Sequence, residues 1–385
     1  MKKNLILCGF CIVWIVISFV ILKFIFFSKS VPSAIDSDFY PGIQTQKTRT
    51  TDWNFNVLAS IDDEITENSM WCGTFQLVWN DMVNEVIKKD VIFSPQPQIV
   101  ENLNKQTFTK KELSPDSYYA KFWLLTLKLK DEIENWIKKK FNENSDILNQ
   151  LDWSNIPQDD RYYKWETEMR YGFYAMLKKI FKFENAFDEL DIWNFADIFN
   201  NIRYFWIRWS SNEELYSQVY VYYYNSENDF AVALKTKEWE DVILARWMKW
   251  NSFVDLYRNI LNYENWYEWK HYFTENDYLK VPELNFRILT EFDELENKSF
   301  YMSNWRDSCH IEKALQSIEL KLDREWWEIK SEAWIGVMED SISPMIEEEH
   351  RYFYFDKPYV MFLKESDKDL PYFAAQISDI TLFQN

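Results

Sequence analysis

A long apolar segment near the N-terminus constrains the chain more than any other feature. Residues 5–27 contain a single charged residue, Lys23. A helix of this length crosses the hydrocarbon core of a bilayer, and Lys23 lies near enough to its end to reach the headgroups. A secretory signal peptide has a shorter apolar core followed by small residues, whereas this segment ends in Phe26 and Phe27. A buried core helix is the alternative, but such helices are rarely so long. We therefore predict an uncleaved signal anchor over residues 1–30.

The remaining chain is predicted to lie outside the cytoplasm, because Lys2 and Lys3 precede the apolar segment and basic residues favour the cytoplasmic side. Residues 31–52 are rich in Ser, Thr, Asp, Pro and Gln, a composition typical of linkers. No Pro/Gly/Ser-rich break divides the rest. We expect a stalk over residues 31–52 and a single extracytoplasmic domain over residues 53–385.

The net charge of the chain and its cysteine and histidine residues restrict the partners and metals that it can bind. The chain has a formal net charge of −19, and its first thirty residues carry four lysines and no acid, so the rest carries −23. This charge repels nucleic acid, and we predict no nucleic-acid partner. Outside the anchor, Cys72 and Cys309 form either a disulfide or two buried thiols. The histidines at positions 271, 310 and 350 have no metal-ligand spacing, and we expect neither a metal nor a cofactor.

Tryptophan and glycine occur in unusual numbers, 20 and 5 respectively, although glycine normally makes up about 7% of a chain. Several tryptophans stand in segments with turn composition, where glycine is usual, among them Trp239, Trp250, Trp266 and the pair at 326–327. One hypothesis is that the gene uses UGA for glycine and has been translated with UGA as tryptophan. The alternative is a truly tryptophan-rich surface, as in sugar-binding proteins.

The pattern of apolar residues predicts an α+β domain with helices mainly in its first half. Helices are predicted at residues 68–88, 114–140, 171–183 and 252–261. From residue 215 onward, short Val- and Tyr-rich runs separated by turns predict an antiparallel meander, followed by further strands up to residue 377. No Gly-rich phosphate loop and no alternation of strand and helix is present, which argues against nucleotide binding.

The C-terminal third resembles the serpin family. Residues 317–334 form a strand pattern that leads into an acidic, small-residue stretch, and Phe355-Asp356-Lys357-Pro358-Tyr359 follows about twenty residues later. Residues 372–379 are similar to the last serpin strand, and residues 281–286 to the family's Pro-Lys-Phe strand. The resemblance implies a serpin-like mixed fold with a large central sheet.

The same resemblance implies a hinge and an exposed reactive loop after residue 322. Matching Ser331-Glu332-Ala333 to the family's Thr-Glu-Ala directs small or apolar residues inward when the loop enters the sheet, although Lys330 then replaces a glycine. The other register, through Glu325, would bury Glu328, Lys330 and Glu332 without partners. The implied hinge residues are Glu328, Ser331, Glu332 and Ala333, and the implied bait residues are Ser341, Ile342, Ser343, Pro344 and Met345.

The resemblance implies a protein without catalytic residues that inhibits serine or cysteine proteases by loop insertion, or a non-inhibitory relative. Two other functions stay open. Abundant aromatic and acidic residues suit a glycan-binding or glycan-cleaving ectodomain, for which Asp188 with Glu189, or Glu213 with Glu214, would supply paired carboxylates. A structural or adhesion protein of the cell surface is the other alternative.

Overall fold

The computed structural model describes residues 44–47, 56–88, 91–93, 95–142, 148, 152–164, 168–246, 251–301, 308–324 and 350–384. The predicted anchor at residues 5–27, the hinge at residues 328–333 and the bait at residues 341–345 lie outside this set. Within the described ranges, no helix is long and apolar enough to cross a membrane.

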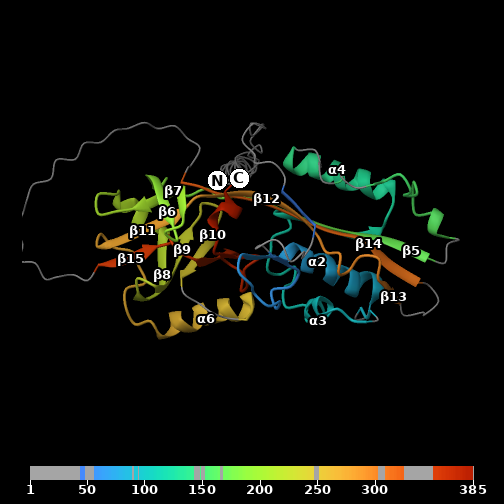
Figure 1. Cartoon of the computed structure of the whole chain (residues 1–385), viewed down its shortest axis with the longest axis horizontal. Helices are drawn as coiled ribbons and strands as arrows, with labels where there is room; N and C mark the ends of the chain where they lie inside the picture. Colours follow the sequence, from blue (N-terminus) through green and yellow to red (C-terminus); the bar gives the residue numbers. More distant parts are fainter. Residues whose placement is uncertain are drawn as a thin grey trace, which may run out of the picture.

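A six-stranded mixed sheet runs along the length of the molecule (Figure 1). Its strands lie in the order β1 (Gln44–Lys47), β12 (Leu284–Glu291), β14 (Ser308–Leu322), β5 (Glu168–Ile180) and β4 (Tyr118–Leu124), with β13 (Ser299–Tyr301) also beside β14. The outer pairs β12–β14 and β4–β5 are antiparallel, whereas β14–β5 and β1–β12 are parallel. Strand β1 belongs to the segment predicted as a stalk, of which the structure describes only these four residues.

Helices cover both faces of this sheet (Figure 1). Helices α2 (Gly73–Asp81) and α3 (Gln98–Asn104) lie on one side, with a π-helical turn (Met82–Ile87) after α2, and α4 (Leu127–Phe141) lies on the other. The strands therefore alternate between two apolar clusters. Leu315 of β14 packs with Leu129 and Ile133 of α4, whereas Ala314 and Ile318 of the same strand belong to the larger core. Burial on both faces means that polar side chains of β14, such as Gln316 and Glu319, are buried as well.

Two further sheets complete the domain. The seven-stranded sheet has the order β2 (Asn56–Leu58), β3 (Ser69–Cys72), β17 (Phe373–Ile377), β16 (Tyr359–Glu365), β10 (Glu240–Arg246), β9 (Asp229–Lys235) and β8 (Val219–Ser226). The four-stranded sheet has the order β15 (Arg351–Tyr354), β11 (Asp277–Pro282), β7 (Phe199–Ile207) and β6 (Asp188–Phe195). Helix α6 (Phe253–Trp266) packs on the seven-stranded sheet, where Phe253 and Tyr257 contact Phe362 with ring centroids 6.0 and 5.6 Å apart. Short 3₁₀ helices occur at Tyr162–Lys164, Glu213–Gln218 and Ile380–Phe383.

The α+β class is confirmed, and so is the meander that β8, β9 and β10 form. Three predicted helices are partly or wholly wrong. The helix predicted at residues 68–88 begins only at Gly73, because Ser69–Cys72 is strand β3, and it continues from α2 into the π-helical turn. Residues 114–140 divide into strand β4 and helix α4, because Tyr118–Leu124 pairs with β5. Residues 171–183 are mostly strand β5, whose alternate residues are buried in the two different clusters. The helix at residues 252–261 is α6, capped by Ser252, whose side chain accepts a hydrogen bond from Asp255 N.

Candidate functional site

The contact between β5 and β14, here called the β5–β14 seam, is the most unusual feature of the large sheet. The two strands run parallel from the pair Glu168/Ser308 to the pair Ile180/Lys321, with one irregularity after Ile311. Both are flanked by antiparallel neighbours. Among the described strands, it is the only parallel contact inside this sheet, since β1 lies at the edge. Parallel ladders are slightly less stable per residue than antiparallel ones.

The chain leaves the seam at the end of β14 and returns in another sheet. Strand β14 ends at Leu322, and β15 begins at Arg351 as the edge strand of the four-stranded sheet. The connection includes residues 325–349, which lie outside the described residues. Every predicted hinge and bait residue belongs to this range. The described chain on either side of these residues ends one strand, β14, and begins another, β15.

A buried row of charges crosses the seam three residues before β14 ends. Glu319 of β14 lies opposite Lys178 of β5 and Arg287 of β12 in the strand registers. Its carboxylate is 3.1 Å from Lys178 Nζ and 3.5 Å from Arg287 Nε. The side chains are 5, 7 and 13% exposed for Glu319, Lys178 and Arg287. Because a buried charge without a partner is costly, the Lys178–Glu319 pair favours contact between β5 and β14.

On the opposite face, a buried amide ties β14 to the start of α2. Gln316 is fully buried, and its Nε2 donates to the carbonyl of Cys72 and the hydroxyl of Thr74, each at 3.0 Å. Thr74 also contacts the Cys72 thiol at 3.3 Å. Burial raises the pKa of Cys72 from 9.0 to about 11, so the thiol stays protonated at neutral pH.

Cys72 and Cys309 are both buried thiols, so of the two alternatives for this pair the disulfide is not formed. The strand geometry gives the reason. Gln316 of β14 reaches Cys72, and Cys309 precedes Gln316 by seven residues on the same strand, or roughly 23 Å at the usual rise per residue. A disulfide requires Cα atoms within about 7 Å of each other.

A second buried ion pair connects the six-stranded sheet to the seven-stranded one. Lys179 of β5 forms a salt bridge with Glu240 of β10, and its Nζ lies 5.2 Å from the ring centroid of Tyr372. The Tyr372 hydroxyl donates to Glu240 Oε2 at 3.1 Å. Burial raises the pKa of Glu240, although Lys179 opposes the shift. Lys178 and Lys179 thus point to opposite faces of β5: Lys178 pairs with β14 within the six-stranded sheet, whereas Lys179 connects this sheet to the seven-stranded one.

Of the two acid pairs proposed for glycan cleavage, the pair of Asp188 and Glu189 does not face a common site. Asp188 and Glu189 are neighbours on β6, so their side chains point to opposite faces. Asp188 accepts a hydrogen bond from the Ser211 hydroxyl, and Glu189 pairs with Arg324 at 2.8 Å. Glu213 and Glu214 are exposed at the start of a 3₁₀ helix. Among the described residues, no group of His, Cys, Asp and Glu could hold a metal ion, and the three histidines are separated.

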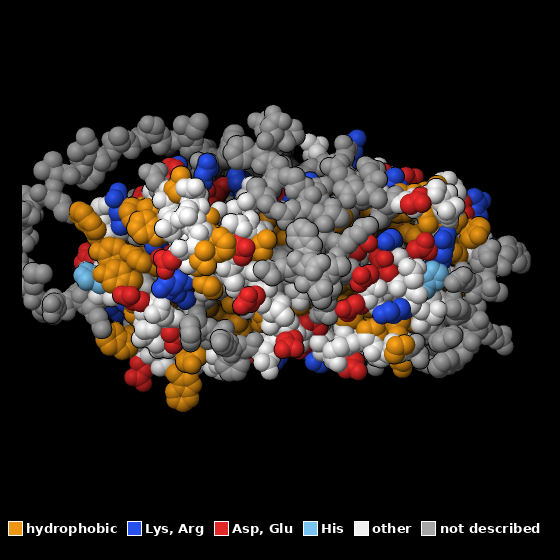
Figure 2. Space-filling model, in the orientation of Figure 1, with side chains coloured by type: hydrophobic (Ala, Val, Ile, Leu, Met, Phe, Trp, Pro, Cys, Tyr) orange, Lys and Arg blue, Asp and Glu red, His pale blue; other side chains and the backbone are white. Residues whose placement is uncertain are grey.

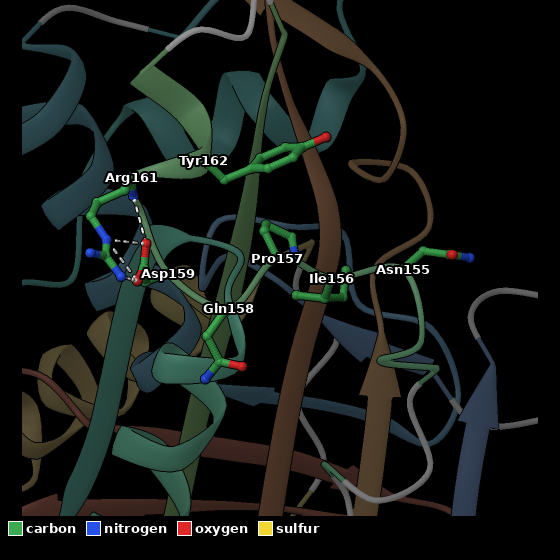
Figure 3. A pocket seen from close by; sticks show the side chains of 7 residues that line it. All are labelled: Asn155, Ile156, Pro157, Gln158, Asp159, Arg161 and Tyr162. Carbon is green, nitrogen blue, oxygen red and sulfur yellow. Dashed lines mark hydrogen bonds and ion pairs between the residues drawn. The ribbon is translucent and has the colours of Figure 1, made fainter.

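Two surface pockets are candidates for small ligands. The smaller, about 390 Å³, lies in the loop at residues 155–162 (Figure 3). Asp159 is the one acidic residue among the described residues that line it, and its carboxylate accepts hydrogen bonds from Arg161. The larger, about 770 Å³, lies beside the end of α6 and includes Tyr263, Trp266 and Trp269 in its walls. Its lining also includes the ion pair of Arg351 and Asp277, with both nitrogen–oxygen distances at 2.8 Å.

Known proteins were compared with the chain by sequence and by structure. No family model and no curated protein matches it. Solved serpins are similar in overall fold. The thermophilic serpin tengpin in its native state has a TM-score of 0.49 at 12% identity, covering 89% of this chain and 98% of that one. Uncleaved ovalbumin has a TM-score of 0.46 at 12% identity, covering 81% and 93%. Serpin-12 of Manduca sexta has a TM-score of 0.44 at 13% identity, covering 74% and 82%.

Proposed function

We propose that the chain is a serpin-like protein that uses a conformational change in place of catalytic chemistry. After a protease cuts the segment between β14 and β15, the part attached to β14 enters the β5–β14 seam as a new central strand. The protein is then either an inhibitor of serine or cysteine proteases or a non-inhibitory relative that undergoes the same change.

The parallel seam is the observation that supports this proposal most directly. A chain that leaves the end of β14 and turns back runs antiparallel to β14. Because β5 is parallel to β14, the returning chain is antiparallel to β5 as well. Its insertion replaces one parallel ladder by two antiparallel ladders and adds the hydrogen bonds of a whole strand, which is favourable.

The length of the connecting segment also suits insertion. Residues 325–349 supply 25 positions, while the seam pairs 13 positions of β5 with β14. About half of the segment is therefore enough to fill the seam, and the rest can span the way to β15. The sequence register with Ser331 and Ala333 directed inward puts a small polar and a small apolar side chain into the sheet.

A panel of serine and cysteine proteases tests the proposal on the soluble domain. A covalent complex that survives SDS is expected for an inhibitor. Cleavage that leaves the domain folded and more resistant to heat is expected for either form. General degradation without added heat resistance would contradict insertion.

Two variants of the hinge make the test specific. Ala333→Arg puts a charge at a position that turns inward, so cleavage should no longer raise heat resistance. Glu332→Arg puts the same side chain on the adjacent, outward position, because side chains alternate along a strand, and should leave the increase intact. Equal behaviour of the two variants would contradict the proposed register.

We further propose that residues 5–27 anchor the protein in a membrane, with the serpin-like domain outside the cytoplasm. The length and apolar character of the segment support this, as does the basic N-terminal flank. The test is carbonate extraction of membranes from cells that make the full chain, followed by protease treatment of intact cells. Release by carbonate, or protection of the domain in intact cells, would contradict the anchor or its orientation.

The aromatic pocket beside α6 favours glycan binding as a second candidate function. Stacked aromatic rings with a few polar groups are a frequent form of ligand site. This candidate depends on Trp266 and Trp269, which are 83 and 66% exposed. Binding of oligosaccharides that is lost in Tyr263→Ala, with unchanged protease behaviour, would support it.

A further inference from the structure

The turn between β9 and β10 has a backbone that glycine normally occupies. Trp239 has a φ angle of 63°, in the left-handed region, and is 82% exposed. Thr236 closes the turn on both sides, because its amide donates to the Glu240 carbonyl at 2.9 Å and its carbonyl accepts from Trp239 N at 3.3 Å. This is a hairpin loop in which the last residue is left-handed, a position for which glycine is the standard choice.

The left-handed conformation is costly for tryptophan. A Cβ atom in this region lowers the folding equilibrium constant roughly five- to thirtyfold relative to glycine. Five of the other described residues with positive φ are Asn or Asp, which tolerate the conformation better. Among the described residues, Trp239 is the only aromatic one with positive φ. Its exposed indole recovers little by burial. Hydrophobic side chains also stand out from the surface around α6 (Figure 2), where Trp266 ends the helix.

The described glycines show the opposite pattern. A side chain would be crowded at both Gly73 and Gly172: a Cβ on Gly73 would be 2.4 Å from the Phe108 ring, and one on Gly172 would be 3.0 Å from Leu125. Neither has a positive φ. The described chain thus has glycine where packing demands it, while its left-handed hairpin position carries a tryptophan.

Two other tryptophans have the surroundings that a real indole requires. Trp79 is fully buried on α2, and its Nε1 donates to Asn104 Oδ1 at 3.0 Å. Trp153 donates from Nε1 to the Leu148 carbonyl at 2.5 Å. Buried or half-buried indoles normally satisfy the N–H in this way. Glycine at position 79 would leave a large cavity in the core.

We propose that the gene encodes residue 239 as UGA, which its own cell reads as glycine, and that the structure separates recoded from genuine tryptophans. The most exposed of the tryptophans that the structure describes, at positions 209, 239, 266 and 269, each at least 62% exposed, belong to the recoded class. Trp79 and Trp153 belong to the genuine class and are encoded by UGG. The pocket beside α6 then loses two of its aromatic walls, since Trp266 and Trp269 are glycines in the native chain.

Codons give the first test. We expect the codon UGA at positions 209, 239, 266 and 269 and the codon UGG at positions 79 and 153. UGG at 239 overturns the proposal, and UGA at 79 overturns the separation by burial and hydrogen bonding. The second test uses the protein purified from its own cells: the tryptic peptide of residues 238–246 should have the mass that glycine gives, and the tryptophan mass overturns the proposal.

A stability measurement tests the backbone argument separately. The full chain made in a host that reads UGA as tryptophan is compared with its Trp239→Gly and Trp239→Ala variants. Alanine removes the indole but keeps the Cβ, so it is the matched control. Glycine should raise the folding equilibrium constant roughly three- to tenfold over alanine, because relief of the left-handed strain exceeds the larger unfolded-state entropy of glycine. Equal stability of the two variants overturns the argument.

Discussion

The ion pair across the β5–β14 seam makes insertion measurable as a change in coupling. Lys178 lies on β5 and Glu319 on β14, on opposite sides of the proposed entry point. Arg287 lies on β12, on the same side as Glu319, and pairs with the same carboxylate. Insertion should separate the first pair and leave the second in place. The cross-seam pair is therefore the probe, and the Arg287–Glu319 pair is its internal control.

The distances give the expected magnitude. At an effective dielectric constant of about 20, opposite charges at the observed 3.1 Å attract by about 5 kcal/mol. One inserted strand adds about 4.8 Å, and at a separation of about 8 Å the attraction falls to about 2 kcal/mol. The coupling between Lys178 and Glu319 should thus decrease by about 3 kcal/mol after cleavage. The Arg287–Glu319 coupling should change by much less, because β12 and β14 stay adjacent.

Double-mutant cycles measure both couplings. The cycles use the three single variants Lys178→Met, Arg287→Met and Glu319→Gln and the two double variants that contain Glu319→Gln. Each variant is unfolded in guanidinium, both as intact and as cleaved protein. Glu312→Gln is the control for the substitution itself, because Glu312 lies on the same strand and pairs with Arg170 at 3.3 Å with both side chains about a quarter exposed. We expect it to change stability by less than about 1 kcal/mol.

An unchanged Lys178–Glu319 coupling in the cleaved protein would refute insertion at this seam. Loss of both couplings together would point instead to general loosening of the sheet. Single variants alone would not separate these outcomes, since removing one partner of a buried pair costs about 3–5 kcal/mol wherever the pair lies. The test therefore depends on the difference between the changes in the two coupling energies.

Three further predictions follow from the described residues. Because burial raises the pKa of Cys72 to about 11, a thiol reagent at pH 8 should label it only after denaturant is added, and rapid labelling of folded protein would contradict its burial. Burial, with Asp323 nearby, raises the pKa of Glu283; its protonated form thus stabilises the fold below the unfolded pKa, and this contribution is lost as pH rises through the folded pKa. Glu283→Gln should therefore gain stability relative to the wild type between pH 4 and pH 7, and a pH-independent difference in urea midpoints would argue against the shift. Thr126 accepts a hydrogen bond from Leu129 N at 3.0 Å, so Thr126→Ala should cost about 1 kcal/mol in thermal or urea unfolding, and no loss would show that the cap is dispensable.

Local signals predicted the parts of the fold that depend on neighbouring residues. The meander β8–β10 was predictable because its turns and alternating strands follow one another directly. The apolar stripe of α4 was also correct, since Leu129, Ile133 and Ile137 are buried together. The single helix over residues 114–140 failed because Tyr118–Leu124 gains its hydrogen bonds from β5, a partner some fifty residues later.

The patterns of residues in the sequence did not predict the β5–β14 seam. Its two strands are far apart in the chain: Arg170 of β5 and Glu312 of β14, which contact each other, are separated by 142 positions. Only the register reveals that Lys178 faces Glu319, and in a pattern of residues the pair Lys178-Lys179 reads as the polar end of a helix. One signal was present: two adjacent lysines that end an apolar run need acidic partners on opposite faces if the run is a strand.

The closed seam has the energetic character that a metastable state requires. Its parallel ladder is weaker than the two antiparallel ladders that insertion would form, while Glu319 and Lys178 are desolvated and stable only as long as each keeps its partner. The charges therefore contribute less to total stability than to the barrier against separation, because a partial opening breaks the pair before a new strand can pair with either edge. Substituting Lys178, Arg287 and Glu319 together by apolar residues of similar size leaves no buried charge without its partner, and should then keep the stability of the intact protein nearly unchanged and accelerate insertion after cleavage. A faster gain of heat resistance in that triple variant, with unchanged guanidinium midpoint before cleavage, would identify these charges as a kinetic lock, and a slower gain would rule this role out.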